Sequence, residues 1–480
     1  MSADNQGSRE DLLAAILSEE SYRPSEPTSL DDIGVPVSMI ESLILKLMLT
    51  AGNLTGRKIA DGICLPFLLL EDVYQALRSR QVITHIGSAP FNDYTYALTD
   101  VGRERARSAM ASCSYCGPAP VPLSDYVLST EAQTIRAESP RRKQLLEAFQ
   151  EISIDPELFE SLGPAINSGA GLFLYGEPGN GKSTLAKRIT QCFGQRIWIP
   201  RTLVEDSQII KLYDPAYHQA DDGQEQQTIL KTAAYDRRWI KIRRPTVVVG
   251  GELTLDSLEI AHNVQGNVSE APIQMKSNCG CLLIDDFGRQ RVDPASLLNR
   301  WIVPLEARID FLTLPTGKKI QVPFEQLIIF STNLEPSDLV DDAFLRRIPY
   351  KIEITDPSYD EVHQLFKIYA KQFRCDYDAD AVEYLLETHY RQTQRAIRRC
   401  HPRDLLSQIR DYCAYNELPT EMRPEYFDRA VRGYFTMISC KQGKSISARP
   451  APAPPAPAAA PFVPGPISDS LVEYANDPRR

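Results

Sequence analysis

Residues 176–183 constrain the fold of this chain more than any other segment, because they fit the pattern G-x-x-x-x-G-K-[ST]. The apolar run before them, 172–175, is expected to form a buried strand. The run after them, 184–189, is expected to begin a helix. A strand, a glycine-rich loop and a helix in this order direct backbone N–H groups and the positive end of the helix at a phosphate group. The segment therefore predicts a phosphate-binding loop within an α/β fold.

Individual loop residues have separate expected roles in holding a nucleotide. Lys182 is expected to reach the β- and γ-phosphates, and the Ser183 hydroxyl is expected to ligate Mg²⁺. ATP and Mg²⁺ are therefore the expected cofactors. The residues expected to bind the nucleotide are Gly176, Glu177, Pro178, Gly179, Asn180, Gly181, Lys182, Ser183 and Thr184.

A second apolar run, 281–284, ends in two adjacent carboxylates, Asp285 and Asp286. A nucleotide hydrolase needs a base that lies beyond the metal ligand, so adjacent acids at a strand end suit this chemistry. Asp285 is expected to hold the water shell of Mg²⁺, and Asp286 to polarise the attacking water. The predicted metal-binding residues are thus Ser183 and Asp285.

Polar residues further along the chain complete the predicted site. The apolar run 326–332 predicts another buried strand, and Asn333 at its end is expected to lie between the acidic strand and the phosphate loop, where it orients the water. Arg346 and Arg347 follow a short helical segment and are expected to face the nucleotide of a neighbouring subunit. A guanidinium there offsets the charge that develops on the γ-phosphoryl group. The alternative for either arginine is a surface ion pair.

A helical stretch at 358–436 supplies one more candidate, Arg403, which is expected to approach the γ-phosphate. Other arginines of this stretch are interpreted as a solvated face: Arg391, Arg395, Arg398 and Arg399. The predicted catalytic residues are Asp286, Asn333, Arg346, Arg347 and Arg403.

These motifs, in this order, resemble an AAA+ ATPase over about residues 131–436. The resemblance implies an α/β P-loop NTPase fold, with a five-stranded parallel sheet, helices on both faces, and a C-terminal helical lid. It also implies a homo-oligomeric ring, usually a hexamer, with ATP between subunits.

Residues 311–323 predict a hairpin just before the strand that ends in Asn333. This hairpin is similar to that of the pre-sensor hairpin branch, which includes MoxR-like proteins and magnesium chelatase subunits. The segment 201–280 is a further insertion, in which 247–255 are expected to form a second moving hairpin. Asp286 departs from the family, because most members have glutamate there, and the water is then expected to be held less well.

Residues 35–112 predict a separate N-terminal unit of three helices, a hairpin and a last helix, which resembles a winged helix, notably at 96–102. The charge of this unit is nearly balanced. Residues 68–70 are all leucine, at a place where a DNA-recognition helix would carry polar side chains. Protein–protein contact or scaffolding is therefore favoured over DNA binding.

Composition sets outer bounds on the chain. Its 480 residues predict two or three domains, and its net charge of −10 argues against affinity of the whole protein for nucleic acid. No apolar run approaches the roughly 20 residues that span a bilayer, and residues 1–10 lack the apolar part of a signal peptide. A cytoplasmic protein without membrane insertion is expected. The scattered cysteines, with one C-x-x-C at Cys113 and Cys116, favour free thiols over zinc.

The expected function is hydrolysis of ATP at subunit interfaces to remodel or assemble a macromolecular client, protein more than DNA. The alternatives are a DNA-linked ATPase of the loader, transposition or transcription type, anchored by the N-terminal unit, and a slow ATP-dependent assembly switch. The predicted organisation is a loose acidic N-terminus (1–34), the winged-helix-like unit (35–112), a linker (113–130), the large α/β domain (131–356), the lid (357–438) and an Ala/Pro-rich tail (439–480).

Overall fold

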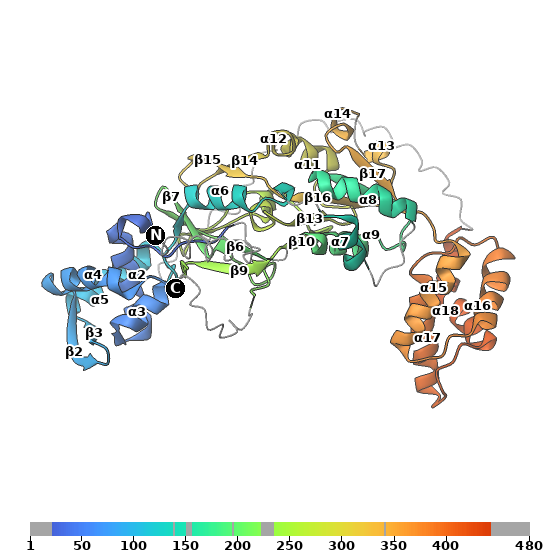
Figure 1. The fold of residues 1–480 in the computed structure, drawn as a ribbon, viewed down its shortest axis with the longest axis horizontal. Helices are drawn as coiled ribbons and strands as arrows, with labels where there is room; N and C mark the ends of the chain where they lie inside the picture. The colour runs from blue at the N-terminus through green and yellow to red at the C-terminus, as the bar shows by residue number, and fades with distance from the viewer. Residues whose placement is uncertain are drawn as a thin grey trace, which may run out of the picture.

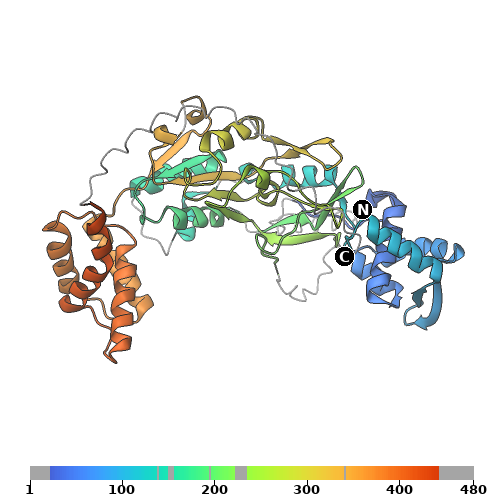
Figure 2. The same ribbon diagram turned by 180° about the vertical axis from the view of Figure 1, so that it is seen from behind.

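The computed structural model has three parts: an N-terminal helical unit, a central α/β body and a C-terminal helical bundle (Figure 1). The view from behind shows the same arrangement, with the two helical parts at opposite ends of the body (Figure 2). The structure describes residues 22–137, 140–149, 156–193, 196–221, 235–339 and 342–442.

The N-terminal unit contains the predicted helices and hairpin in the predicted order. Thr55 and Thr99 cap two of its helices, because their hydroxyls accept hydrogen bonds from the backbone N–H groups of Lys58 and Gly102. Its apolar side chains form one buried cluster. The winged-helix interpretation itself stays a prediction. The elements are η1 (Asp31–Ile33), α2 (Val37–Ala51), β1 (Leu54–Thr55), α3 (Gly56–Ile63), α4 (Phe67–Ser79), β2 (Ile83–Ala89), β3 (Asp93–Leu98) and α5 (Asp100–Ser112).

The body contains a parallel sheet flanked by helices. Its strands are β5 (Leu172–Tyr175), β10 (Thr246–Val249), β13 (Cys281–Ile284), β16 (Leu327–Thr332) and β17 (Tyr350–Glu353). Its helices are η2 (Ile135–Ala137), α7 (Arg142–Ala148), α8 (Pro156–Ser168), α9 (Lys182–Ile189), η3 (Thr190–Cys192), η4 (Leu255–Leu258), α10 (Ile273–Lys276), α11 (Pro294–Arg300), α12 (Ile302–Ala307), α13 (Pro336–Leu339) and α14 (Asp342–Leu345).

Within the described residues, this sheet has five parallel strands in the order β10-β13-β16-β5-β17. Successive residues of a strand face opposite sides. Phe173 packs with α11, α12 and α14, whereas Leu172 and Leu174 pack with α7, α8 and α9. Helices therefore cover both faces, which confirms the predicted α/β fold class with its five-stranded parallel sheet. The order also places the three motif-bearing strands, β13, β16 and β5, side by side.

A second group of strands lies between the N-terminal unit and the parallel sheet (Figure 1). Among the described residues it comprises a sheet of order β11-β12-β8-β7-β4 and the pairs β6-β9 and β14-β15. We call the sheet of order β11-β12-β8-β7-β4 the inserted sheet. The elements of this group are β4 (Val121–Pro122), α6 (Leu123–Ala132), β6 (Arg196–Pro200), β7 (Thr202–Glu205), β8 (Gln208–Lys211), β9 (Trp239–Arg243), β11 (Ala261–Asn263), β12 (Val268–Glu270), β14 (Ile309–Thr313) and β15 (Lys319–Pro323).

The two hairpin predictions have different outcomes. The hairpin predicted at 311–323 is confirmed as β14-β15. The hairpin predicted at 247–255 is wrong, because β10 pairs with β13 as an edge strand of the parallel sheet. Val247 and Val249 are buried there, so the apolar run belongs to the core and cannot move as an exposed hairpin.

Two segments predicted to lie outside the domains, the loose N-terminus and the linker, are packed into the fold. The linker expected at 113–130 contains β4 and most of α6, whose Tyr126 is buried and donates to the Met275 carbonyl oxygen at 3.2 Å. The described part of the N-terminus, 22–34, lies against the body, where the buried Arg238 donates to the Ile33 carbonyl oxygen at 2.7 Å. The rest of the N-terminus, 1–21, and the tail from 443 lie outside the described residues.

The C-terminal bundle occupies the stretch predicted to be helical and has one apolar core. Ser358 begins its first helix with a capping box completed by Glu361. Among the described residues, no helix is both long and apolar enough to cross a bilayer. The bundle comprises α15 (Tyr359–Phe373), α16 (Ala379–Leu386), the π-helical turn η5 (Glu387–Arg391), α17 (His401–Tyr415) and α18 (Pro424–Gln442).

Candidate nucleotide-binding site

The predicted phosphate loop connects β5 to α9, as the sequence indicates. Gly176 and Gly179 have φ angles of 130° and 89°, which side-chain-bearing residues rarely adopt. A Cβ atom at Gly176 would lie 2.5 Å from the Ile354 carbonyl oxygen, and one at Gly179 would lie 2.7 Å from Cys400 Sγ. Both glycines are thus required by conformation and by space.

Lys182 lies at the centre of the loop and is only 6 % exposed. Its Nζ donates to the carbonyl oxygens of Gly176 and Glu177, at 2.8 and 3.0 Å, and to Asn333 Oδ1 at 2.6 Å. Burial lowers the pKa of Lys182 below its ordinary value, although the nearby Asp286 and Asp285 oppose this effect. A cation with so little water around it is well suited to bind phosphate oxygens.

The acidic pair lies against the loop. Ser183 Oγ donates to Asp285 Oδ1 at 2.8 Å, so the two predicted metal ligands are already in contact. Asp286 is exposed and has a φ of 51°. Asn333 Nδ2 lies 3.4 Å from Asp286 Oδ1. Asn333 therefore lies between the lysine of the loop and the second carboxylate, as the order of the strands predicts.

These residues fit ATP and Mg²⁺. A cavity of about 480 Å³ adjoins the loop, a size typical of small-molecule sites. Its lining includes Gly176, Glu177 and Asn333, but also the carboxylates of Glu335, Asp338, Glu353 and Asp356, and it does not include Lys182, Ser183 or Asp285. The fit to phosphate therefore rests on the loop itself and not on this cavity. No group of three or more His, Cys, Asp or Glu side chains that could hold a metal occurs in the described part of the chain. Mg²⁺ needs no such group, because it is usually held by one or two carboxylates together with substrate phosphates and water.

The helical bundle contacts the loop through residues just before α17. Arg398 Nη2 donates to Glu177 Oε2 at 3.1 Å, and its Nη1 pairs with Asp356. Asn180 of the loop donates to the same Asp356 carboxylate at 2.7 Å. The Cys400 N–H donates to the Gly179 carbonyl oxygen at 2.9 Å. The bundle thus lies over the loop as a lid would.

His401, the first residue of α17, holds the segment 398–400 in place. Its Nδ1 accepts a hydrogen bond from the Arg398 N–H at 3.1 Å and lies 3.0 Å from the Tyr390 hydroxyl oxygen. Burial, together with the nearby arginine charge, lowers the pKa of His401 to about 4. A neutral imidazole is needed for Nδ1 to accept the Arg398 N–H, so the segment is held in place at neutral pH.

The three predicted arginines have different surroundings in the structure. Arg403 is exposed and pairs with Asp404 of its own helix at 2.8 Å. Arg347 pairs with Glu306 at 2.7 Å, in line with the ion-pair alternative for one of the two residues. Arg346 is exposed at the end of α14.

Arg398 and Arg399 are the site residues that sequence reasoning missed, because they were interpreted as a solvated face. The Arg399 N–H donates to Asn180 Oδ1 at 3.2 Å, next to the contacts of Arg398. The available signal was their place immediately before the start of α17, where a segment can reach the loop. The remaining residues of the predicted set, Pro178, Gly181 and Thr184, are exposed.

Comparison with known protein families finds one match, to a family described as "Domain of unknown function (DUF8689)", over residues 358–433. This range is the helical bundle. An uncharacterized protein, ORF529 of Acidianus two-tailed virus, is 27 % identical over 230 residues, which are 46 % of this chain and 35 % of that protein. The chain thus spans about a third of the length of the viral protein.

Solved structures give weaker likenesses. NtrX from Brucella abortus, solved in complex with ADP, is 13 % identical with a TM-score of 0.36, covering 67 % of this chain and 64 % of that chain. The Holliday junction branch migration motor RuvB from Thermotoga maritima is 14 % identical with a TM-score of 0.32, covering 58 % and 67 %. Values this low support no inference about the activity of this chain.

Proposed function

We propose that this protein is an AAA+ ATPase of the cytoplasm that binds ATP with Mg²⁺ and hydrolyses it at the interfaces of a homo-oligomeric ring. The free energy is used to remodel or assemble a protein client. The observation that carries the proposal is the meeting of Lys182, Ser183, Asp285 and Asn333 at the carboxyl edge of one parallel sheet, where such sheets bind ligands.

Each residue of the site has a role in this proposal. Lys182 and the loop N–H groups bind the phosphates, while Ser183 and Asp285 hold the metal. Bound Mg²⁺ supplies neutralisation of the charge that develops on the transferred phosphoryl group. Asp286 accepts a proton from the attacking water through a carboxylate oxygen, and Asn333 orients that water.

The direct test is release of phosphate from ATP by the purified full chain in the presence of Mg²⁺, together with sizing with and without ATP. The rate of turnover per subunit is expected to rise with protein concentration, because the active site is shared between subunits. Slow turnover combined with ATP-dependent assembly would favour the switch. A protein that neither retains ATP with Mg²⁺ nor produces ADP at any concentration would refute the proposal.

Arg346 is the better candidate to complete the site of a neighbouring subunit, since Arg347 is paired with Glu306. Arg346→Ala is expected to lower turnover by about 10³-fold or more while ATP binding is kept, because an arginine finger acts on the transition state. Mixing Arg346→Ala with Lys182→Ala, each inactive alone, is expected to restore activity at interfaces that combine an intact loop with an intact arginine. No recovery on mixing, with assembly intact, would argue against a shared site.

The contacts favour Arg398 over Arg403 as the lid arginine. Arg398→Ala is expected to lower turnover at least about tenfold, since it removes a charge beside the phosphates and the link to Glu177 and Asp356. Arg403→Ala is expected to change turnover little, because its partner is Asp404. Steady-state phosphate release by the two variants decides between them, and the opposite ranking would reinstate Arg403.

The surface of the N-terminal unit supports a protein client. Leu68 of α4 is 77 % exposed, and Glu71 and Asp72 follow it at the spacing of one helical turn. Phe91, between β2 and β3, is 85 % exposed. The exposed leucine beside two carboxylates suits a protein contact and would repel DNA phosphates, whereas the charged neighbour of Phe91 is Arg57, whose guanidinium lies 5.9 Å from the ring centroid. We therefore keep DNA as the lesser alternative.

We also assign the chain to the pre-sensor hairpin branch, because the β14-β15 hairpin comes directly before β16.

A further inference from the structure

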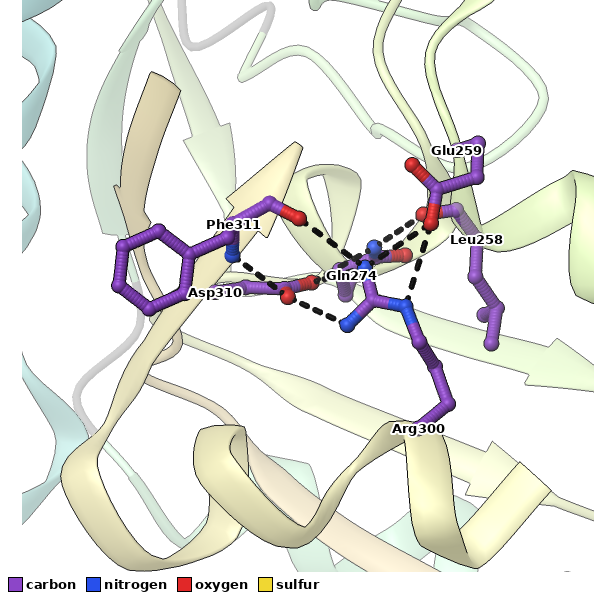
Figure 3. Close-up of polar contacts among 6 residues, drawn as sticks. All are labelled: Leu258, Glu259, Gln274, Arg300, Asp310 and Phe311. Atoms are coloured by element: carbon purple, nitrogen blue, oxygen red, sulfur yellow. Dashed lines mark hydrogen bonds and ion pairs between the residues drawn. The ribbon is translucent and has the colours of Figure 1, made fainter. Parts of the chain in front are cut away.

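Arg300, the last residue of α11, joins that helix to the base of the β14-β15 hairpin. Its Nη1 donates to Asp310 Oδ1 at 2.6 Å, and its Nε and Nη2 donate to Glu259 Oε1, both at 3.1 Å. The guanidinium lies between the two carboxylates in Figure 3. A planar fork of this kind fixes its partners in direction as well as in distance.

Asp310 is buried, with 1 % of its surface exposed, and its carboxylate is fully used. Besides Arg300, it accepts hydrogen bonds from Gln274 Nε2 at 3.0 Å and from the Phe311 N–H at 2.8 Å. Gln274 Nε2 also donates to the Leu258 carbonyl oxygen at 2.6 Å (Figure 3). A buried charge left without its partner is costly, so α11 and the hairpin base are expected to move together.

The other end of α11 leads to the nucleotide site. Asp293 caps the helix by accepting from the Ser296 N–H at 3.0 Å, directly after the loop that carries Asp285 and Asp286. That loop is tied to β16, because the Phe287 N–H donates to the Ser331 carbonyl oxygen at 2.7 Å. The acidic loop and α11 are consecutive in the chain, so a displacement of the loop is expected to move the start of α11.

The hairpin shares one apolar cluster with α6 and the inserted sheet. Leu312 and Ile320 of the hairpin are buried in the same cluster as Leu203 of β7. At the tip, Lys318 Nζ donates to Glu205 Oε1 at 2.8 Å. The hairpin is thus joined to the inserted sheet through α6, which contacts both β15 and β7, and through an ion pair at its tip.

The inserted sheet is packed on its opposite face against the N-terminal unit. Val204 follows Leu203 in β7 and so faces the other way, where it joins the core of the N-terminal unit with Ile209 of β8. The Ser114 N–H adds a backbone hydrogen bond to the Gly266 carbonyl oxygen at 2.8 Å. The inserted sheet is therefore a layer between the hairpin and the N-terminal unit.

We propose that Arg300 is a positioning residue that transmits nucleotide-dependent movement of the acidic loop to the hairpin, and that the hairpin, inserted sheet and N-terminal unit move as one arm. This inference rests on the proposed function, because it needs ATP bound at the loop. The proposed path runs from the acidic loop through α11, the hairpin and the inserted sheet to the surface of the N-terminal unit that carries Leu68 and Phe91. Arg300 acts through Asp310 and touches no reacting atom.

The test is hydrogen–deuterium exchange of the full chain, read by mass spectrometry, with and without Mg²⁺ and the slowly hydrolysed analogue ATPγS. In the wild type, ATPγS is expected to change exchange in 309–323, in 202–211 and in α2. Arg300→Lys keeps the charge but loses the fork, so it is expected to fold. The ATPγS-dependent changes in all three segments are expected to be lost, while the Kd for ATPγS stays within about twofold, less than a usual coupling effect.

Two controls separate transmission from general damage. Arg291→Lys alters an exposed arginine in the loop before α11 and is expected to leave every exchange change in place. Glu205→Lys and Lys318→Glu each place like charges at the hairpin tip, and each is expected to weaken the changes in 202–211 and α2 but not those in 309–323. The double reversal restores the pair and is expected to restore the changes.

The outcomes distinguish this inference from the proposed function. If the wild type binds ATPγS but the hairpin shows no change, or if Arg300→Lys keeps the full change, transmission through Arg300 is refuted. If the double reversal behaves like the single ones, the arm does not move as one body. If ATPγS does not bind the wild type, the proposed function itself fails.

Discussion

Replacing Lys182 by alanine is expected to abolish detectable ATP binding, with a loss of affinity of at least ~100-fold. Each hydrogen bond to a charged group contributes about 1.5–3 kcal/mol, and Lys182 is expected to make two or more with phosphate oxygens. The side chain is buried in the loop and its Nζ already makes three short contacts there. No other cation of the loop itself can take its place, since the remaining residues of 176–184 carry no positive charge.

The measurement is calorimetric titration of the full chain with ATP in the presence of Mg²⁺. Lys187→Ala is the matched control, because Lys187 lies on the same helix, is exposed and carries the same charge. It is expected to bind ATP like the wild type. Affinity retained by Lys182→Ala would mean that the nucleotide is held elsewhere.

Asp286→Asn is expected to retain ATP while lowering turnover by roughly 10²–10⁴-fold, the contribution typical of a general base. An amide cannot accept the proton of the attacking water. Asparagine tolerates the left-handed backbone of this position, where φ is 51°. Since Asp285 and Ser183 are unchanged, the metal ligands stay in place.

Single-turnover hydrolysis and nucleotide retention by the full chain check this prediction, with the exposed Asp72→Asn as a control outside the site. A trapped ATP state is also expected to hold the client, so co-purification with Asp286→Asn is the most direct route to its identity. Turnover retained by the variant would remove Asp286 from the role of base.

The elements that the sequence predicts well are those with a strong local signal. The apolar runs that become β5, β13 and β16 are each followed by a motif that marks where the strand ends. Asn333 is expected between the acidic strand and the loop because it ends a predicted buried strand, and its contacts with Lys182 and Asp286 agree with that expectation. The N-terminal unit was predictable because its helices have apolar residues at helical spacing.

The inserted sheet was missed because its pairing is non-local. β4 pairs with β7, and β12 with β8, in parallel register across long stretches of sequence. Strands of two to four residues carry no periodicity that could reveal such partners. Arg398 was missed for a related reason, since its role depends on how the bundle docks on the loop.

The close approach of Gly179 to Cys400 fixes how near the helical bundle can lie to the loop. The bundle meets the loop through a backbone hydrogen bond at this point, and a Cβ atom on Gly179 would clash with Cys400 Sγ at 2.7 Å. The distance between the bundle and the loop therefore depends on the absence of a side chain at Gly179. The left-handed backbone of the loop and the docking of the bundle thus both require glycine at this position.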